Sequence, residues 1–149
     1  MRTGVRVGVD VGKARIGVAR SDLHGMLAMP VETVRRGEGD VLAILAHAVD
    51  LEATEIIVGL PLSLSGAETA STKDARDFAA EIARHSGTVA VRLVDERLST
   101  VSAQQALRSA GRTTRNSRNV VDQVAAVIIL QHALDVERAS GNPPGTLLP

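Results

Sequence analysis

The chain of 149 residues has no cysteine, no tryptophan and no tyrosine, and its only aromatic residue is Phe78. Without cysteine it can form neither a disulfide framework nor a thiolate zinc site, and it has no cysteine nucleophile. Without tryptophan and tyrosine, it is poorly equipped to recognise nucleic acid by stacking splayed bases on aromatic rings. Function therefore has to rest on charged, polar and aliphatic side chains.

Long hydrophobic runs are also missing. The longest purely apolar run, residues 124–130, is far shorter than the ~20 residues that a membrane-spanning helix needs. Asp10 interrupts the apolar stretch near the N-terminus, so no signal-peptide core is predicted. We therefore expect a cytoplasmic protein that makes no contact with a membrane.

The chain has no net charge, because 17 basic side chains balance 17 acidic ones. This balance removes the simplest signature of a nucleic-acid-binding domain, which is a strong excess of basic residues. The charges are nevertheless unevenly distributed, since residues 97–121 contain five arginines and no acid. Neutrality of the whole chain thus does not exclude a local cationic surface.

Length and composition indicate one globular domain, with 44% hydrophobic and 23% charged residues. Valines alternate with other residues from position 5 to 11, which predicts a strand. Similar patterns predict strands over 15–20, 26–34, 55–60 and 88–94, helices over 40–51, 68–85, 99–110 and 119–138, and a polar loop over 111–118.

The order of these elements predicts an α/β fold. Three neighbouring strands with short connections indicate an antiparallel meander, and the run Ile56-Ile57-Val58 is typical of a parallel strand buried on both faces. We expect a mixed five-stranded sheet with helices on both faces, formed by residues 1–138. The tail over 139–149 is rich in proline and glycine, and we expect it to be disordered.

Asp10 is the first candidate functional residue. Glycines at positions 8 and 12 flank it on the same face of the strand, which leaves room for an ion or a phosphate to approach the backbone. The structural alternative is an aspartate that supports the following turn.

Asp95 and Glu96 follow the strand predicted over 88–94. Their side chains point to opposite faces while strand geometry persists, so only one of them can easily join Asp10. The alternative is a solvated charge cluster in which Arg97 pairs locally with its neighbours.

Asp122 shares a predicted helix face with Ala125, Ala126, Ile129 and Ala133. An ionised carboxylate beside such a face is costly unless it is paired, and a nearby cation would remove that cost. The alternative is a solvated aspartate in the first turn of the helix, where the helix dipole favours a negative charge.

Carboxylates that converge from three separate elements repel one another unless hard cations neutralise them. Mg²⁺ suits such a site, because it takes one or two carboxylates together with water and substrate phosphates. Two ions about 3.5–4 Å apart can activate a water molecule and stabilise the leaving oxygen of a phosphodiester. The three acids therefore indicate a metal-dependent phosphodiesterase site.

Basic and glycine-rich segments could hold the phosphates. The loop from Arg112 to Arg118 is cationic and rich in hydroxyl groups, and it leads directly to Asp122. Arginine forks match phosphate oxygens well. The segment Gly59–Gly66 could present backbone amides to a phosphate, although a tight connection between a strand and a helix explains it equally well.

Four segments of the chain resemble the YqgF-type, Holliday-junction-resolvase-like proteins, which are also described as pre-16S ribosomal RNA nucleases. They lie in the family's order and span residues 8 to 130. The matching segments are Gly8–Ala19, Ile56–Pro61, Asp95–Thr100 and Val121–Leu130.

The resemblance implies a ribonuclease-H-like fold and a nuclease site that uses Mg²⁺ or Mn²⁺. The catalytic and metal-binding residues it implies are Asp10, Glu96 and Asp122, with Asp95 as a further candidate ligand. The nucleic-acid-binding residues we expect are Arg15, Arg97, Arg108, Arg112, Arg115 and Arg118. The expected phosphate-contacting loop residues are Gly12, Gly59, Ser63 and Gly66.

The implied role is maturation of the 5′ end of precursor 16S ribosomal RNA in the bacterial cytoplasm, by a monomer or a homodimer. A nuclease of branched DNA and a non-catalytic, RNA-binding ribosome assembly factor are the alternatives. A nucleotide-binding ATPase is a weaker one, because the two lobes of an actin-like ATPase need more than 149 residues.

Overall fold

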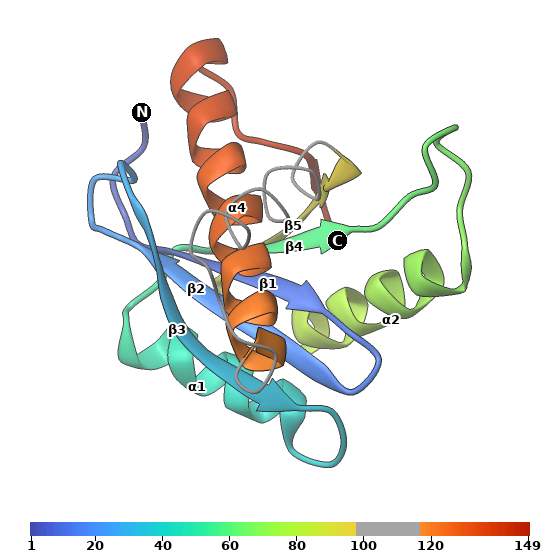
Figure 1. Ribbon diagram of the computed structural model, residues 1–149. Helices are drawn as coiled ribbons and strands as arrows, with labels where there is room; N and C mark the ends of the chain where they lie inside the picture. Colours follow the sequence, from blue (N-terminus) through green and yellow to red (C-terminus); the bar gives the residue numbers. More distant parts are fainter. Residues whose placement is uncertain (98–116) are drawn as a thin grey trace.

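The computed structural model describes residues 1–97 and 117–149 and shows one mixed sheet between two layers of helices (Figure 1). The strands are β1 (Arg6–Val11), β2 (Arg15–Ser21), β3 (Ala28–Arg35), β4 (Glu55–Leu60), β5 (Ala90–Asp95) and β6 (Thr146–Leu147). The helices are α1 (Asp40–Asp50), α2 (Ala70–His85) and α4 (Ser117–Ser140). The helix predicted over 99–110 lies outside the described residues.

The strand order is β3-β2-β1-β4-β5-β6. β1, β2 and β3 pair antiparallel in sequence order, which confirms the predicted meander. β4 pairs parallel with β1 and with β5, so the carboxyl ends of β1, β4 and β5 meet at one edge of the sheet. In parallel α/β sheets this edge is where functional groups gather.

Each face of the sheet is covered by helices, as the sequence predicts. α1 and α2 lie on one face and α4 crosses the other (Figure 1). The core under α1 and α2 contains the alternating residues Val7 and Val9 of β1 together with Phe78 of α2. The intervening positions of β1, Gly8 and Asp10, consequently face α4, because successive side chains of a strand point to opposite faces.

Helix α4 lies very close to the sheet because glycines stand beneath it. A Cβ atom added to Gly8 would lie 2.7 Å from the Leu130 Cβ atom, and one added to Gly17 would collide with the backbone oxygen of Asp122. A Cβ atom at Gly59 would lie 2.7 Å from Ile129 Cδ1. The space beside Asp10 at Gly8 is thus occupied by the helix, so the expectation that this glycine leaves room for an ion is wrong.

The C-terminal tail differs from the sequence prediction. Helix α4 continues to Ser140, and β6 then pairs antiparallel with β5 through Arg92 and Leu93. The backbone N–H of Leu148 also donates to Val91 O at 2.9 Å. The tail over 139–149, predicted to be disordered, instead supplies the sixth strand of a sheet predicted to have five.

A buried ionic network fixes the C-terminal end of α4 to the sheet. Glu137 of α4 accepts hydrogen bonds from Arg2 at 2.6 Å and from the buried Arg6 at 3.1 Å. Glu55 of β4, also buried, accepts bonds from Arg2 at 3.1 Å and from Arg92 at 2.6 Å. Two buried acids are therefore matched by three arginines at this end of the helix.

Within the described ranges, no helix is both long and apolar enough to cross a bilayer.

Candidate active site

Three acidic residues from three elements lie on the α4 side of the sheet. Asp10 is near the carboxyl end of β1, and Glu96 directly follows β5 at the same edge. Asp122 lies in the second turn of α4. The alternative interpretation, a solvated aspartate stabilised by the helix dipole, required it to lie in the first turn. The glycine at position 17 lets the backbone of Asp122 rest directly on β2.

Asp10 is a largely buried carboxyl group at the centre of this arrangement. Burial, and secondarily the negative charge of Asp122, raise its pKa from an ordinary 3.8 to about 6. Among the described residues, Asp10 makes no ion pair that would offset this cost. The fold therefore holds a carboxylate at this position although it is electrostatically unfavourable.

Glu96 shares this environment. Burial raises its pKa to about 7, and the charges of Asp10 and Asp95 add to the shift. A Cβ atom at Gly59 would collide with Glu96 Oε2, so the glycine in β4 provides the space that the carboxyl group occupies. Asp10 is thus coupled to an acid on either side, Asp122 on α4 and Glu96 after β5.

Asp95 has the opposite environment. It is exposed, and its carboxylate accepts hydrogen bonds from the backbone N–H of Arg97 at 3.0 Å and from Arg97 Nε at 2.8 Å. These bonds lower its pKa. The two adjacent acids therefore separate as the strand alternation predicts, and Arg97 pairs locally with Asp95.

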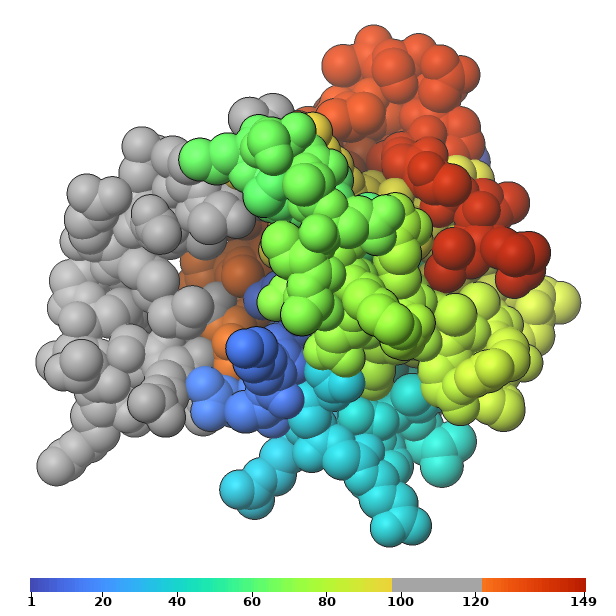
Figure 2. All heavy atoms as spheres, turned by 90° about the vertical axis from the view of Figure 1, so that its right-hand side faces the viewer, coloured from blue at the N-terminus to red at the C-terminus, as the bar shows by residue number. Residues whose placement is uncertain are grey.

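Arg15 contacts the acidic centre directly. Its Nε donates to Asp122 Oδ2 at 2.9 Å across the gap between β2 and α4. Both side chains keep part of their surface in solvent, at 32% exposure for Arg15 and 18% for Asp122. Figure 2 shows part of α4, in orange, beside the blue residues around the β1–β2 turn. Of the two expected nucleic-acid-binding arginines whose side chains the structure describes, Arg97 pairs with Asp95 and Arg15 with Asp122.

The acids fit a divalent cation by their chemistry. Two carboxyl groups with raised pKa values and a third nearby form an oxygen-rich, mutually repelling set, which a hard cation would stabilise. In the part of the chain that the structure describes, no three histidine or acidic side chains are close enough together to hold a metal ion. Binding of one cation by all three acids would therefore require their side chains to lie closer together than they do here.

Other predicted contact residues have structural roles. The N–H of Gly12 donates to Arg15 O at 2.9 Å in the β1–β2 turn, and the N–H of Gly66 donates to Ser63 O at 2.8 Å. Gly59 lies inside β4 rather than in a loop. The side chain of Arg118 and all of Arg108, Arg112 and Arg115 lie outside the described residues.

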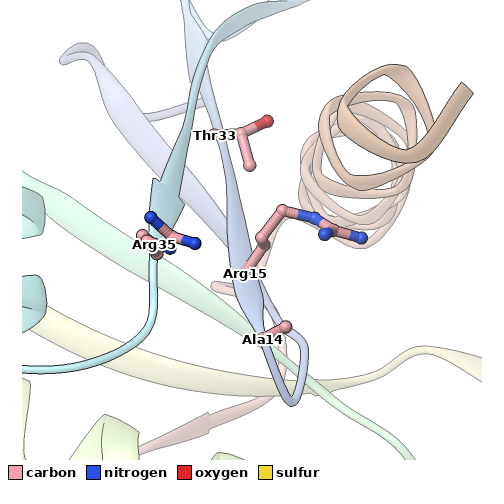
Figure 3. A pocket seen from close by; sticks show the side chains of 4 residues that line it. All are labelled: Ala14, Arg15, Thr33 and Arg35. Atoms are coloured by element: carbon pink, nitrogen blue, oxygen red, sulfur yellow. The ribbon is translucent and has the colours of Figure 1, made fainter. Parts of the chain in front are cut away.

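The structure adds one basic residue that the sequence reasoning missed. Arg35 of β3 lies directly opposite Arg15 of β2 and lines the same pocket, of about 330 Å³, with Ala14 and Thr33 (Figure 3). Its position in the strand could have revealed it. Val34 faces the core under α1 and α2, and successive side chains of a strand point to opposite faces, so Arg35 faces the α4 side.

A mixed sheet that begins with three antiparallel strands, continues with parallel strands and carries helices on both faces is the ribonuclease-H-like fold. The fold is similar to that of a solved Thermus thermophilus structure, "T. thermophilus RuvC in complex with Holliday junction substrate". The match has a TM-score of 0.60 and covers 97% of this chain and 99% of that one at 16% identity, which shows a shared fold.

The chain belongs to the family described as "RuvX: Holliday junction resolvase", whose model matches residues 4–136. A protein of Clavibacter sepedonicus named "Putative pre-16S rRNA nuclease" is 62% identical, with 100% of this chain and 94% of that protein covered. A protein of Leifsonia xyli subsp. xyli with the same name is 60% identical, with 97% and 94% covered.

Proposed function

We propose that this protein is an endonuclease that depends on Mg²⁺ or Mn²⁺ and processes the 5′ end of precursor 16S ribosomal RNA. The observation that carries the proposal is the pair of largely buried carboxyl groups of Asp10 and Glu96, whose pKa values are raised, near Asp122. A protein that only binds RNA gains nothing from acids whose charges are held in an unfavourable environment, because such acids repel the phosphate backbone. A hydrolytic metal site does need them.

The three acids would hold the cations, which supply neutralisation of the phosphate charge and activation of water. Asp10, held rigidly on β1, would be the central ligand, with Glu96 and Asp122 on either side. The glycines beneath α4 would fix the helix so closely to the sheet that Asp122 can reach the centre. Arg15 would steer the phosphate backbone toward the acids from the β2 side.

The substrate assignment rests on the relatives. Proteins 60% and 62% identical to this chain are named for pre-16S ribosomal RNA, and their lengths match over almost the whole chain. A bacterial ribosomal RNA precursor is a cytoplasmic substrate, so the proposal places the protein in the cytoplasm. The second candidate is cleavage of a four-way DNA junction, which the description of the family favours.

The direct test measures Mn²⁺-dependent cleavage by the wild type and by Asp10→Asn. The substrates are a precursor 16S RNA fragment that includes the 5′ end and an immobile four-way DNA junction. We expect the wild type to cut the RNA at a defined position and Asp10→Asn to lose at least about a hundredfold in rate. That loss exceeds the 10–100-fold typical of residues that only support a metal ligand.

The matched control is Asp50→Asn, which makes the same chemical change at an exposed residue at the end of α1. It should cut at the wild-type rate. Equal cleavage by the wild type and Asp10→Asn would overturn the catalytic proposal. RNA binding without any Mn²⁺-dependent cleavage would favour an assembly factor, and cleavage of the junction alone would favour a DNA substrate.

A further inference from the structure

The pocket between β2 and β3 is a second feature of the α4 side of the sheet. It has a volume of about 330 Å³, and Ala14, Arg15, Thr33 and Arg35 line it. In Figure 3 the Arg15 side chain reaches from β2 toward α4, while Arg35 stands beside it on β3. Of these four residues, Arg15 was expected to bind nucleic acid, whereas Arg35 and Thr33 carried no predicted role.

Two arginines lie side by side there at a cost. Arg15 and Arg35 are direct partners in the antiparallel pairing of β2 with β3. Directly opposite positions bring Cβ atoms to about 4.5–5.5 Å, and like charges at that separation are destabilising. A pair of this kind on the rim of a pocket is stabilised when an anion binds between the two guanidinium groups.

Arg35 is available for an anion. It is exposed, and in the described ranges it forms no ion pair. Its neighbour Arg36 shows the contrast, because that guanidinium is held by Asp74 at 2.8 Å and also donates to Gly12 O at 2.9 Å on the other side of the sheet. Two consecutive arginines therefore differ in role, with Arg36 fixed in the fold and Arg35 presented to solvent.

The pocket adjoins the acidic centre through two contacts with α4. Arg15 donates to Asp122 at 2.9 Å, and the Gln123 side chain donates to Thr33 Oγ1 at 3.1 Å. A ligand in the pocket therefore lies next to the proposed hydrolytic site and on the same side of the sheet. If Asp122 held a cation, Arg15 would lose this partner and could contact an anion in the pocket, which it already lines.

We propose that this pocket binds a phosphate of the nucleic-acid backbone next to the one that is cut, with Arg35 as its principal ligand and Arg15 as its second. The proposal deepens the proposed nuclease function and rests on it for the identity of the ligand. Arginine forks bind phosphate oxygens in bidentate fashion, and a diester in an extended strand presents such oxygens at every nucleotide. Arg35 thus positions the substrate and touches no reacting atom.

The experiment measures binding without cleavage. Fluorescence anisotropy in EDTA would follow a labelled precursor 16S RNA hairpin and a labelled four-way DNA junction over a series of salt concentrations. The variants are Arg35→Ala and Arg35→Lys, with Arg84→Ala as the matched control. Arg84 lies on α2, on the opposite face of the sheet, and its side chain is 69% exposed.

We expect Arg35→Ala to weaken binding of the RNA about 3–10-fold at ~0.1 M salt and to reduce the salt slope by about 1, the value for one lost phosphate contact. Arg35→Lys should recover part of the affinity, because it keeps the charge but loses the fork. Arg84→Ala should bind as the wild type does. The melting temperature of Arg35→Ala should not fall, since the variant removes a like-charge pair.

Wild-type affinity and salt slope for Arg35→Ala would overturn the proposal, as would an equal loss for Arg84→Ala. The proposal would also be overturned if Arg35→Ala bound RNA and the junction as the wild type does and differed only in its affinity for inorganic phosphate. The pocket would then be a site for small anions. The outcome is separable from that of the nuclease proposal. Binding is measured without metal, and only the cleavage comparison with Asp10→Asn tests catalysis.

Discussion

Acidic side chains have opposite environments at the two ends of helix α4. At its C-terminal end, Glu137 is buried and accepts bonds from Arg2 and Arg6. Burial alone would raise the pKa of Glu137, but these arginines lower it below the usual value. At the N-terminal end, the pKa values of Asp10 and Glu96 are raised to about 6 and about 7.

The comparison shows that this fold can pair buried acids with arginines. At the other end, the same helix and sheet pair Glu137 and Glu55 with three arginines, Arg2, Arg6 and Arg92. At the acidic end, Arg15 pairs with Asp122, while the pKa values of Asp10 and Glu96 stay raised. Stability given up in one place and preserved in another is typical of a functional site.

The largest expected effect comes from breaking the compensated end. Glu137→Ala leaves the buried guanidinium of Arg6 without its carboxylate, which should lower the free energy of unfolding by about 3–5 kcal/mol. Urea denaturation measures the loss. Asp135→Ala, on an exposed residue of the same helix, should change stability by less than about 0.5 kcal/mol. If both variants lost equally little free energy of unfolding, the network would not anchor the helix.

Gly17→Ala should disturb the acidic end by displacing the helix. The added Cβ atom would collide with the backbone oxygen of Asp122, so α4 must shift away from β2. We expect a stability loss of about 1–3 kcal/mol and loss of Mn²⁺-dependent cleavage. Chemical denaturation and the cleavage assay measure the two effects, and full activity in a folded variant would contradict the close placement of Asp122.

Asp10→Asn should have the opposite effect on stability. The pKa of Asp10 is raised in the folded protein, so its stability contribution is complete below pH 4 and is lost as the pH rises through about 6. Above that pH, replacing the charged group should stabilise the metal-free protein by roughly 2–3 kcal/mol, from 1.36 kcal/mol per pKa unit. Denaturation in EDTA at pH 8 and at pH 4 checks this, because the gain should disappear at the lower pH.

Arg15→Ala should produce the smallest change. Removing the partner of Asp122 frees that carboxylate for a cation, so we expect Mn²⁺ affinity to rise by a few-fold while RNA affinity falls. The ion pair itself, which is partly exposed, contributes only ~0–1 kcal/mol to stability. Calorimetric titration with Mn²⁺ would show the gain, and weaker Mn²⁺ binding would mean that Arg15 orients Asp122 for the metal instead of competing for it.

Much of the fold could be predicted from the sequence, because the alternation and the apolar runs reflect which face of each strand is buried. Alternation in β1 and the apolar run in β4 predict strands, and the meander and the parallel pairing both follow from their order. The predicted order of acids along the chain places Asp10 and Glu96 at one sheet edge. Strand alternation also separates Asp95 from Glu96.

Features that depend on distant contacts could not be predicted. The two residues of β6 are too few to show a period, and they are ordered by pairing with β5. Gly8 has the same sequence signature whether an ion or a helix approaches it, and here α4 does. The buried partners Arg6 and Glu137 are far apart in the chain, so each one alone resembles a surface charge.

The central claim is that the acidic end of α4 is a site for a divalent cation. Calorimetric titration of Mn²⁺ into the wild type, Asp10→Asn and the control Asp50→Asn tests it most directly. We expect saturable binding by the wild type and by Asp50→Asn, and an affinity at least about tenfold lower for Asp10→Asn. Equal Mn²⁺ affinity in all three proteins, or no binding by the wild type, would contradict it.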